Sequence, residues 1–176
     1  MRFLAVLFLV CAGLVGQTVP RPAIDFPITL PGGSKISPTQ KKGKVVIVEV
    51  LLTTCPHCQE SARVFTKLLK EYGPKGLEVM GAAVNPDADI PGFVKTTGAT
   101  FPIGTVPRES VFGFLEHSMM RPNMYFPVVV IIDRKGVVRG QFSGTDPFFK
   151  AEEANLRAMI DKLIAEGAQT PTKKAS

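Results

Sequence analysis

The feature that most restricts the fold of this chain is a cysteine pair placed directly after a strongly apolar segment. Residues 45–52 read VVIVEVLL, and Glu49 alone interrupts the apolar run. A continuous run of this kind is typical of a strand buried on both faces of a sheet. Cys55 and Cys58 follow in the sequence CPHC, and apolar residues at helical spacing then continue to Gly73. The sequence therefore predicts a strand, a turn that carries two cysteines, and a helix that begins at this turn.

The position of both cysteines at the start of a helix favours redox chemistry. The N-terminus of a helix concentrates positive partial charge, which stabilises a thiolate at Cys55. His57 lies between the cysteines, and its ring N–H or imidazolium form can stabilise the same anion. Stabilising the reduced thiolate makes the disulfide a stronger oxidant. We predict a redox-active disulfide in which Cys55 is the attacking sulfur and Cys58 the resolving sulfur.

Three other uses of a cysteine pair fit the sequence less well. A zinc site requires a second pair of ligands, for which His117 is a lone candidate. A covalent haem site requires a histidine directly after the second cysteine, where this chain has Gln59. A purely structural disulfide would add little stability here, because the loop it closes is short. We therefore expect neither a resident metal nor another cofactor at this site.

The remaining apolar segments predict an α/β domain. Strands that alternate with helices predict a mixed central sheet flanked by helices, and a turn at Gly136 adds an antiparallel edge. An N-terminal β-hairpin is expected where residues 26–30 and 34–37 flank a Pro-Gly-Gly turn. Further strands are expected at 77–84, 127–133 and 137–142, and further helices at 85–97, 108–118 and 147–165.

Size and charge exclude several classes of protein. The 176 residues suit one domain, and a 45% hydrophobic composition can supply its core without disulfide bonds. The net charge is +6, but the lysines are spread along the chain and no aromatic residues interleave with them. We therefore expect a solvated basic surface and no nucleic-acid partner.

Residues 1–18 have the pattern of a signal peptide. Arg2 supplies a positive charge, and residues 3–15 form an uncharged apolar run that small residues follow. This run is shorter than the roughly 20 residues that a membrane-spanning helix needs. An uncleaved anchor, which would tether the protein to a membrane, is the alternative. Cys11 belongs to the apolar run and would be removed with the signal peptide.

Removal of this segment would leave a domain over residues 19–168 and a polar tail over residues 169–176. We expect the protein to be periplasmic or secreted. Export places Cys55 and Cys58 in an oxidising compartment, where disulfide chemistry is possible.

The strand before the cysteines, the CPHC turn and a later apolar strand that opens with Pro127 resemble the thioredoxin superfamily. The N-terminal hairpin and the Gly43-Lys44 approach to the strand are similar to exported thiol–disulfide oxidoreductases of the TlpA/ResA type. The CPHC sequence itself resembles that of DsbA-type oxidases, although this chain has no room for their large helical insertion. The resemblance covers residues 24–165 and implies a thioredoxin-like fold.

Two further residues match positions of that superfamily. Pro127 stands where its members have a cis-proline that faces the cysteines, and a cis X–Pro bond exposes backbone that can pair with a bound peptide. Glu49, six residues before Cys55, stands where they have a buried acid. Because burial of an unpaired charge is costly, a neutral Glu49 could relay protons to and from Cys58. The alternatives are an ordinary strand-initiating proline and a glutamate that faces solvent.

Two positions depart from the pattern of the superfamily. Thr54 stands where an aromatic residue usually precedes the first cysteine, and Phe126 stands before Pro127 where smaller residues are common. The resemblance implies that both positions contact substrate, so a substrate preference does not transfer from the relatives. The nearby segment 118–126 is rich in methionine, which suits either core packing or an adaptable docking loop.

The leading functional hypothesis is an exported oxidoreductase that exchanges disulfides with the protein thiols or disulfides of a soluble or membrane-bound redox partner. His57 favours an oxidant, whereas the resemblance implies reductants that serve cytochrome maturation. A peroxiredoxin-like peroxidase is an alternative, but Val48 and Leu52 stand where that family has Pro and Thr. The non-enzymatic alternative is a copper chaperone that binds the metal through Cys55, Cys58 and a histidine.

Overall fold

A computed structural model describes residues 19–117 and 123–168 of the chain. The predicted signal peptide (1–18), the predicted tail (169–176) and residues 118–122 of the methionine-rich segment lie outside the described residues. Within the described residues, no helix is long and apolar enough to cross a membrane.

The described residues build one mixed sheet whose strands lie in the order β1-β8-β7-β4-β5-β6-β2-β3. Strand β4 is central, and it pairs in parallel with β5 and antiparallel with β7. The prediction of a mixed sheet with an N-terminal hairpin is confirmed, because β2 and β3 pair antiparallel. The strands are β1 (Arg21–Pro22), β2 (Ile28–Thr29), β3 (Lys35–Ile36), β4 (Val45–Leu51), β5 (Leu77–Ala83), β6 (Ile103–Thr105), β7 (Val128–Ile132) and β8 (Val137–Ser143).

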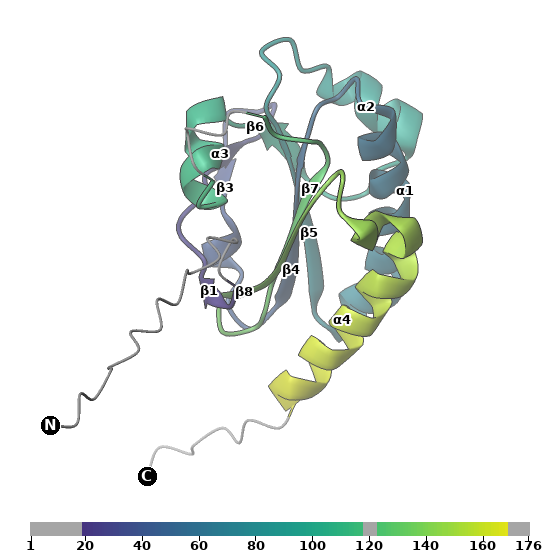
Figure 1. The fold of residues 1–176 in the computed structure, drawn as a ribbon. Coiled ribbons are helices and arrows are strands. Elements are labelled where there is room, and N and C mark those ends of the chain that lie inside the picture. The colour runs from purple at the N-terminus through teal and green to yellow at the C-terminus, as the bar shows by residue number, and fades with distance from the viewer. Residues whose placement is uncertain (1–18, 118–122, 169–176) are drawn as a thin grey trace, which may run out of the picture.

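Helices cover both faces of this sheet (Figure 1). Helices α1, α2 and α4 lie on one face, while α3 lies on the other (Figure 1). The helices are α1 (Pro56–Tyr72), α2 (Ile90–Thr97), α3 (Arg108–Phe114) and α4 (Glu152–Ala168), with short 3-10 helices η1 (Pro38–Gln40), η2 (Gly73–Lys75) and η3 (Pro147–Ala151).

Strand β4 is buried along its whole length because both of its faces are covered. Its side chains alternate between the two sides of the sheet. Val45, Ile47 and Leu51 pack in the core beneath α1 and α4, whereas Val46 and Val48 belong to the core beneath α3. By the same alternation, Glu49 points to the side of α1 and α4, so the one acidic residue of the strand is directed into a hydrophobic core.

Several predicted boundaries were wrong for local reasons. The helix expected from residue 85 begins only at Ile90, because the Asp89 side chain caps the amide of Gly92 and Pro86 interrupts the preceding loop. The helix expected over 147–165 divides into η3 and α4. The helix expected over 108–118 ends at Phe114, and Ser118 lies outside the described residues.

Two strands were not predicted, since each is too short to show a periodic pattern. Strand β1 pairs with β8, so the hairpin at Gly136 does not form the edge of the sheet as expected. Strand β6 extends the parallel part of the sheet beside β5, and β2 then pairs with β6. The N-terminal hairpin is therefore part of the main sheet.

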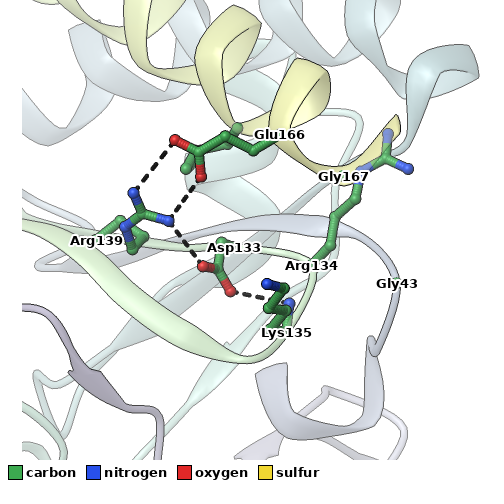
Figure 2. Close-up of a pocket in the computed structure, with 8 residues that line it drawn as sticks. Gly43, Asp133, Arg134, Lys135, Arg139, Glu166 and Gly167 are labelled. Atoms are coloured by element: carbon green, nitrogen blue, oxygen red, sulfur yellow. Dashed lines mark hydrogen bonds and ion pairs between the residues drawn. The ribbon is translucent and has the colours of Figure 1, made fainter. Parts of the chain in front are cut away.

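A cluster of charged side chains joins the β7–β8 turn to the last turns of α4 (Figure 2). The Arg139 guanidinium contacts Asp133 at 3.0 Å and Glu166 at 2.8 Å. These residues surround a hollow of about 310 Å³. Because Asp133 follows the end of β7 that pairs with the beginning of β4, this hollow lies at the opposite end of the sheet from the cysteines.

Candidate active site

The two cysteines occupy the first turn of α1, directly after the turn that ends β4. Cys55 is the N-cap residue of α1, and its Sγ accepts a hydrogen bond of 3.3 Å from the backbone N–H of Cys58. Pro56 occupies the first helical position, where a backbone N–H would have no acceptor within the helix, so its absence in proline costs no hydrogen bond. Cys55 is partly exposed, whereas Cys58 is fully buried, and both are free thiols. The helix N-terminus therefore presents Cys55 to solvent and holds Cys58 behind it.

The loop before β7 faces this turn. The peptide bond between Phe126 and Pro127 is cis, as predicted. The carbonyl oxygen of Phe126 lies 4.0 Å from the Sγ of Cys55. The amide of Gly144 donates to the carbonyl of Tyr125 at 2.9 Å, which ties this loop to the end of β8. The structure thus brings Phe126 and Pro127 to Cys55 from a distant part of the sequence.

The turn that leads to Cys55 is held by side chains that sequence reasoning missed. Asn85 accepts a hydrogen bond from the amide of Thr53 at 3.1 Å and donates to its hydroxyl at 3.0 Å. Gln59 donates to the carbonyl of Thr53 at 3.2 Å. Asn85 directly follows the apolar residues of β5, and the carboxyl ends of parallel strands β4 and β5 meet at one edge of the sheet. Asn85 was therefore predictable from the sequence, because a residue that follows β5 must lie beside the turn that follows β4.

Glu49 is completely buried, so the alternative in which it faces solvent is wrong. Neither of its carboxyl oxygens has a hydrogen-bond partner among the described residues. Burial raises the pKa of Glu49 well above its ordinary value of 4.5, and the nearby Glu152 and Cys55 raise it further. Burial of this carboxyl therefore favours its protonated form.

The thiol of Cys58 is also shifted toward its protonated form. Burial raises the pKa of Cys58, and the neighbouring Cys55 and Glu49 raise it further. The two sulfurs are therefore unequal, because one is accessible and accepts an amide hydrogen bond while the other is enclosed and must lose a proton before it can attack.

His57 and Thr54 lie on the outer surface of the turn. The His57 side chain is 81% exposed, and its Nδ1 lies 3.5 Å from a carboxyl oxygen of Glu60. Thr54 is exposed beside Cys55. An open hollow of about 380 Å³ begins here, and Thr54, Gln59 and Asp89 line part of it.

Glu152 is a second acidic residue near the site that sequence reasoning missed. It is the first residue of α4, and burial raises its pKa while a hydrogen bond from Ser61 opposes that shift. No local pattern could have identified it, because its position depends on how α4 packs against the sheet. In the part of the chain that the structure describes, no group of three or more His, Cys, Asp or Glu side chains could hold a metal ion.

A central parallel and antiparallel sheet, a CxxC pair at the β4–α1 turn and a facing cis-proline together define a protein of thioredoxin-like fold. Residues 14–160 match the Redoxin family, and the chain belongs to this family.

Related proteins agree with this assignment. The thioredoxin-like protein YneN of Bacillus subtilis (strain 168) is 29% identical over 135 residues, which cover 74% of this chain and 75% of YneN. The thiol-disulfide oxidoreductase ResA of Bacillus thuringiensis (strain Al Hakam) is 25% identical over 156 residues, which cover 81% of this chain and 87% of ResA.

Solved structures show the same fold. A thiol:disulfide interchange protein of the thioredoxin family from Chlorobium tepidum TLS superposes with a TM-score of 0.68 at 23% identity, covering 85% of this chain and 99% of that one. The thioredoxin domain of a thiol-disulfide oxidoreductase from Bacteroides vulgatus superposes with a TM-score of 0.67 at 16% identity, with the same coverage of 85% and 99%. The prediction of a thioredoxin-superfamily oxidoreductase related to ResA is confirmed.

Proposed function

We propose that this protein is an exported oxidoreductase that exchanges disulfides with partner proteins through Cys55 and Cys58. The observation that carries the proposal is the inequality of the two sulfurs. Cys55 is accessible and accepts the N–H of Cys58 at the N-terminus of α1, whereas Cys58 is buried directly behind it. An accessible attacking sulfur backed by an enclosed resolving sulfur suits a two-step exchange.

In the reductive direction, the Cys55 thiolate attacks a disulfide of the partner. One partner sulfur leaves as a thiolate, and the other becomes joined to Cys55 in a mixed disulfide. Cys58 then loses its proton and attacks the Sγ of Cys55, which forms the Cys55–Cys58 disulfide and releases the second partner thiolate. Two electrons pass from the protein to the partner, and the same steps in reverse oxidise a partner dithiol.

Several neighbouring residues support this reaction. Glu49 is placed to exchange the proton of Cys58, because it is a buried acid whose charge acts on that thiol. Phe126 and Pro127 present backbone beside Cys55, where an extended partner segment can pair with it. Thr54 and His57 line the exposed side of the turn, where they contact the partner.

Export is supported by the pattern of the first 18 residues, a positive charge followed by an apolar run that is short for a membrane span. The protein then acts in the periplasm or outside the cell, on soluble or membrane-bound redox partners. Mass analysis of the exported protein tests this proposal, because cleavage near residue 18 removes Cys11 and leaves two thiols, whereas an uncleaved anchor retains all three cysteines.

Paired assays of insulin reduction and of ribonuclease reoxidation test the exchange activity. We expect wild-type protein to act in at least one assay, Cys55→Ser to be inactive in both, and Cys58→Ser to accumulate a mixed disulfide with its substrate. Silence of the wild-type protein in both assays would contradict the proposal. The reduction potential of the pair then gives the direction, since a value near about −270 mV indicates a reductant and a value near about −120 mV an oxidant.

A further inference from the structure

Among the residues that the structure describes, three carboxyl oxygens of Glu49 and Glu152 are buried without a hydrogen-bond partner. They are both oxygens of Glu49 and the Oε1 atom of Glu152. A buried polar atom without a partner is uncommon in a folded protein, and two acids that share this property near one thiol require an explanation.

The two acids lie on the same side of the sheet. Glu49 points from β4 toward α1 and α4, and α4, which begins at Glu152, packs against both β4 and α1. Ser61, which is buried one turn after Cys58 on α1, is close enough to the Glu152 carboxyl to lower its pKa. Glu152 therefore belongs to the junction of α4 with α1 and β4, and its side chain is only partly buried there.

In the part of the chain that the structure describes, no cationic side chain is among the groups that act on Glu49. Its neighbours across the sheet are Gly81 on β5 and Val129 on β7, neither of which carries a charge. The titratable groups that act on Glu49 are Glu152 and Cys55, and Glu49 in turn acts on Cys58.

This arrangement limits how Glu49 can accept a proton from Cys58. A protonated Glu49 cannot accept the proton of Cys58 until it has released its own proton. Glu49 is completely buried, so its carboxyl has no direct contact with solvent to which it could release that proton. Outside the cysteine pair, the titratable group whose charge reaches Glu49 is Glu152.

We propose that Glu152 is a positioning residue that acts through Glu49, forming the outer carboxyl of a proton path from Cys58 to solvent. This inference rests on the proposed function. During resolution of a mixed disulfide, the proton of Cys58 passes to the Glu49 carboxylate, and the proton that Glu49 held beforehand leaves through the Glu152 carboxylate to solvent. The Cys58 sulfur meanwhile forms its bond to Cys55, and the partner sulfur leaves as a thiolate.

Glu152 is suited to both ends of such a path. Its partial burial favours the protonated form, while the hydrogen bond from Ser61 and its place in the first turn of α4 favour the carboxylate. These opposed effects let one carboxyl accept a proton on its inner side and release it on its outer side.

The test uses a reagent that separates the two cysteine steps. Reduced protein is mixed with a small aromatic disulfide whose released thiolate absorbs light, and two phases are followed by stopped flow. The first phase reports attack by Cys55, and the second reports attack by Cys58. The variants are Glu152→Gln, Glu152→Asp and the matched control Glu153→Gln, whose carboxylate pairs with Lys67 and Arg157 on the surface.

In Glu152→Gln we expect the second phase to slow about tenfold near neutral pH, with an unchanged first phase. The pKa of Glu49, followed by NMR of its carboxyl carbon, falls because a like charge is removed. Glu152→Asp restores most of the rate, and Glu153→Gln behaves as wild type.

A second phase in Glu152→Gln with the rate and pH profile of wild type would overturn the inference. So would a slowdown of equal size at every pH, which a merely structural role produces. In either case a normal first phase and retained insulin or ribonuclease activity leave the proposed function intact. A wild-type protein with neither phase overturns both.

Discussion

The backbone N–H of Cys58 donates a hydrogen bond of 3.3 Å to the Sγ of Cys55. This contact makes Cys55 both the N-cap of α1 and the accessible sulfur of the pair. Cys58, which supplies this donor, also carries the second sulfur of the pair, and its side chain is fully buried. One helical turn thus stabilises negative charge on the outer cysteine while it encloses the inner one.

Replacing Glu49 with Gln should change how stability depends on pH. The pKa of Glu49 is raised in the folded protein, so between its ordinary value of 4.5 and the raised value the native state holds a proton that the unfolded chain has lost. The free energy of unfolding of wild type then falls with rising pH, by up to about 1.4 kcal/mol per pH unit from this group. Glu49→Gln lacks this contribution.

Urea unfolding between pH 5 and pH 8 measures the difference. We expect the stability of Glu49→Gln relative to wild type to increase with pH across this range. A constant difference would contradict the raised pKa. Measurements stay below pH 9, because Cys58, whose ordinary pKa is 9.0 and is raised by burial, adds a further loss of stability at alkaline pH in both proteins.

Replacing Asn85 with Ala should loosen the turn before Cys55. Two hydrogen bonds to the buried Thr53 are lost, so we expect a decrease of about 1–3 kcal/mol in the free energy of unfolding and a slower reaction of Cys55 with an aromatic disulfide. Asn155→Ala is the matched control, because it removes one hydrogen bond to Phe148 in another part of the fold. Equal effects of both variants on the Cys55 rate would count against a specific role for Asn85.

Replacing Gly144 with Ala should displace the loop that carries Pro127. A Cβ atom at residue 144 would meet the backbone carbonyl of Phe126, which cannot move without shifting the cis-proline. We expect the free energy of unfolding to fall by about 1–3 kcal/mol and disulfide exchange to be slower. Gly113→Ala is the control, because a Cβ there meets no atom within 4 Å, and in the last turn of α3 the substitution should raise the free energy of unfolding by about 0.5–1 kcal/mol at most. A Gly144→Ala protein with wild-type stability and activity would show that the loop tolerates the shift.

Replacing Arg139 with Gln should affect stability alone. The Arg139 guanidinium joins the β7–β8 turn to α4 through Asp133 and Glu166 (Figure 2). The strand register places this cluster at the opposite end of the sheet from the cysteines. Asp133 keeps its hydrogen bonds from the amides of Lys135 and Val137, and the Glu166 carboxylate, which loses Arg139, is 42% exposed to solvent. We expect a small decrease in thermal stability that is reduced at 1 M salt, and unchanged exchange rates. A change in the Cys55 or Cys58 rate would instead indicate coupling along α4.

The central part of the fold was predictable because its signals are local. The apolar run at residues 45–52 identified β4, and the CPHC turn followed by helical periodicity identified α1. The resemblance to the thioredoxin superfamily added the cis-proline at residue 127 and the burial of Glu49, both of which the structure contains. The short strands β1 and β6 were missed, since two or three residues carry no periodic pattern.

What the sequence alone determined is the chemistry of the site, namely two cysteines at the start of a helix and an acid within the preceding strand. Only the tertiary structure decided which other residues surround those groups. Asn85 braces the turn because β5 ends beside β4, and Glu152 acts on Glu49 because α4 packs across the same face of the sheet. Helical and strand patterns depend on residues that are close in the sequence. Contacts between residues far apart in the chain arise only when the helices pack against the sheet.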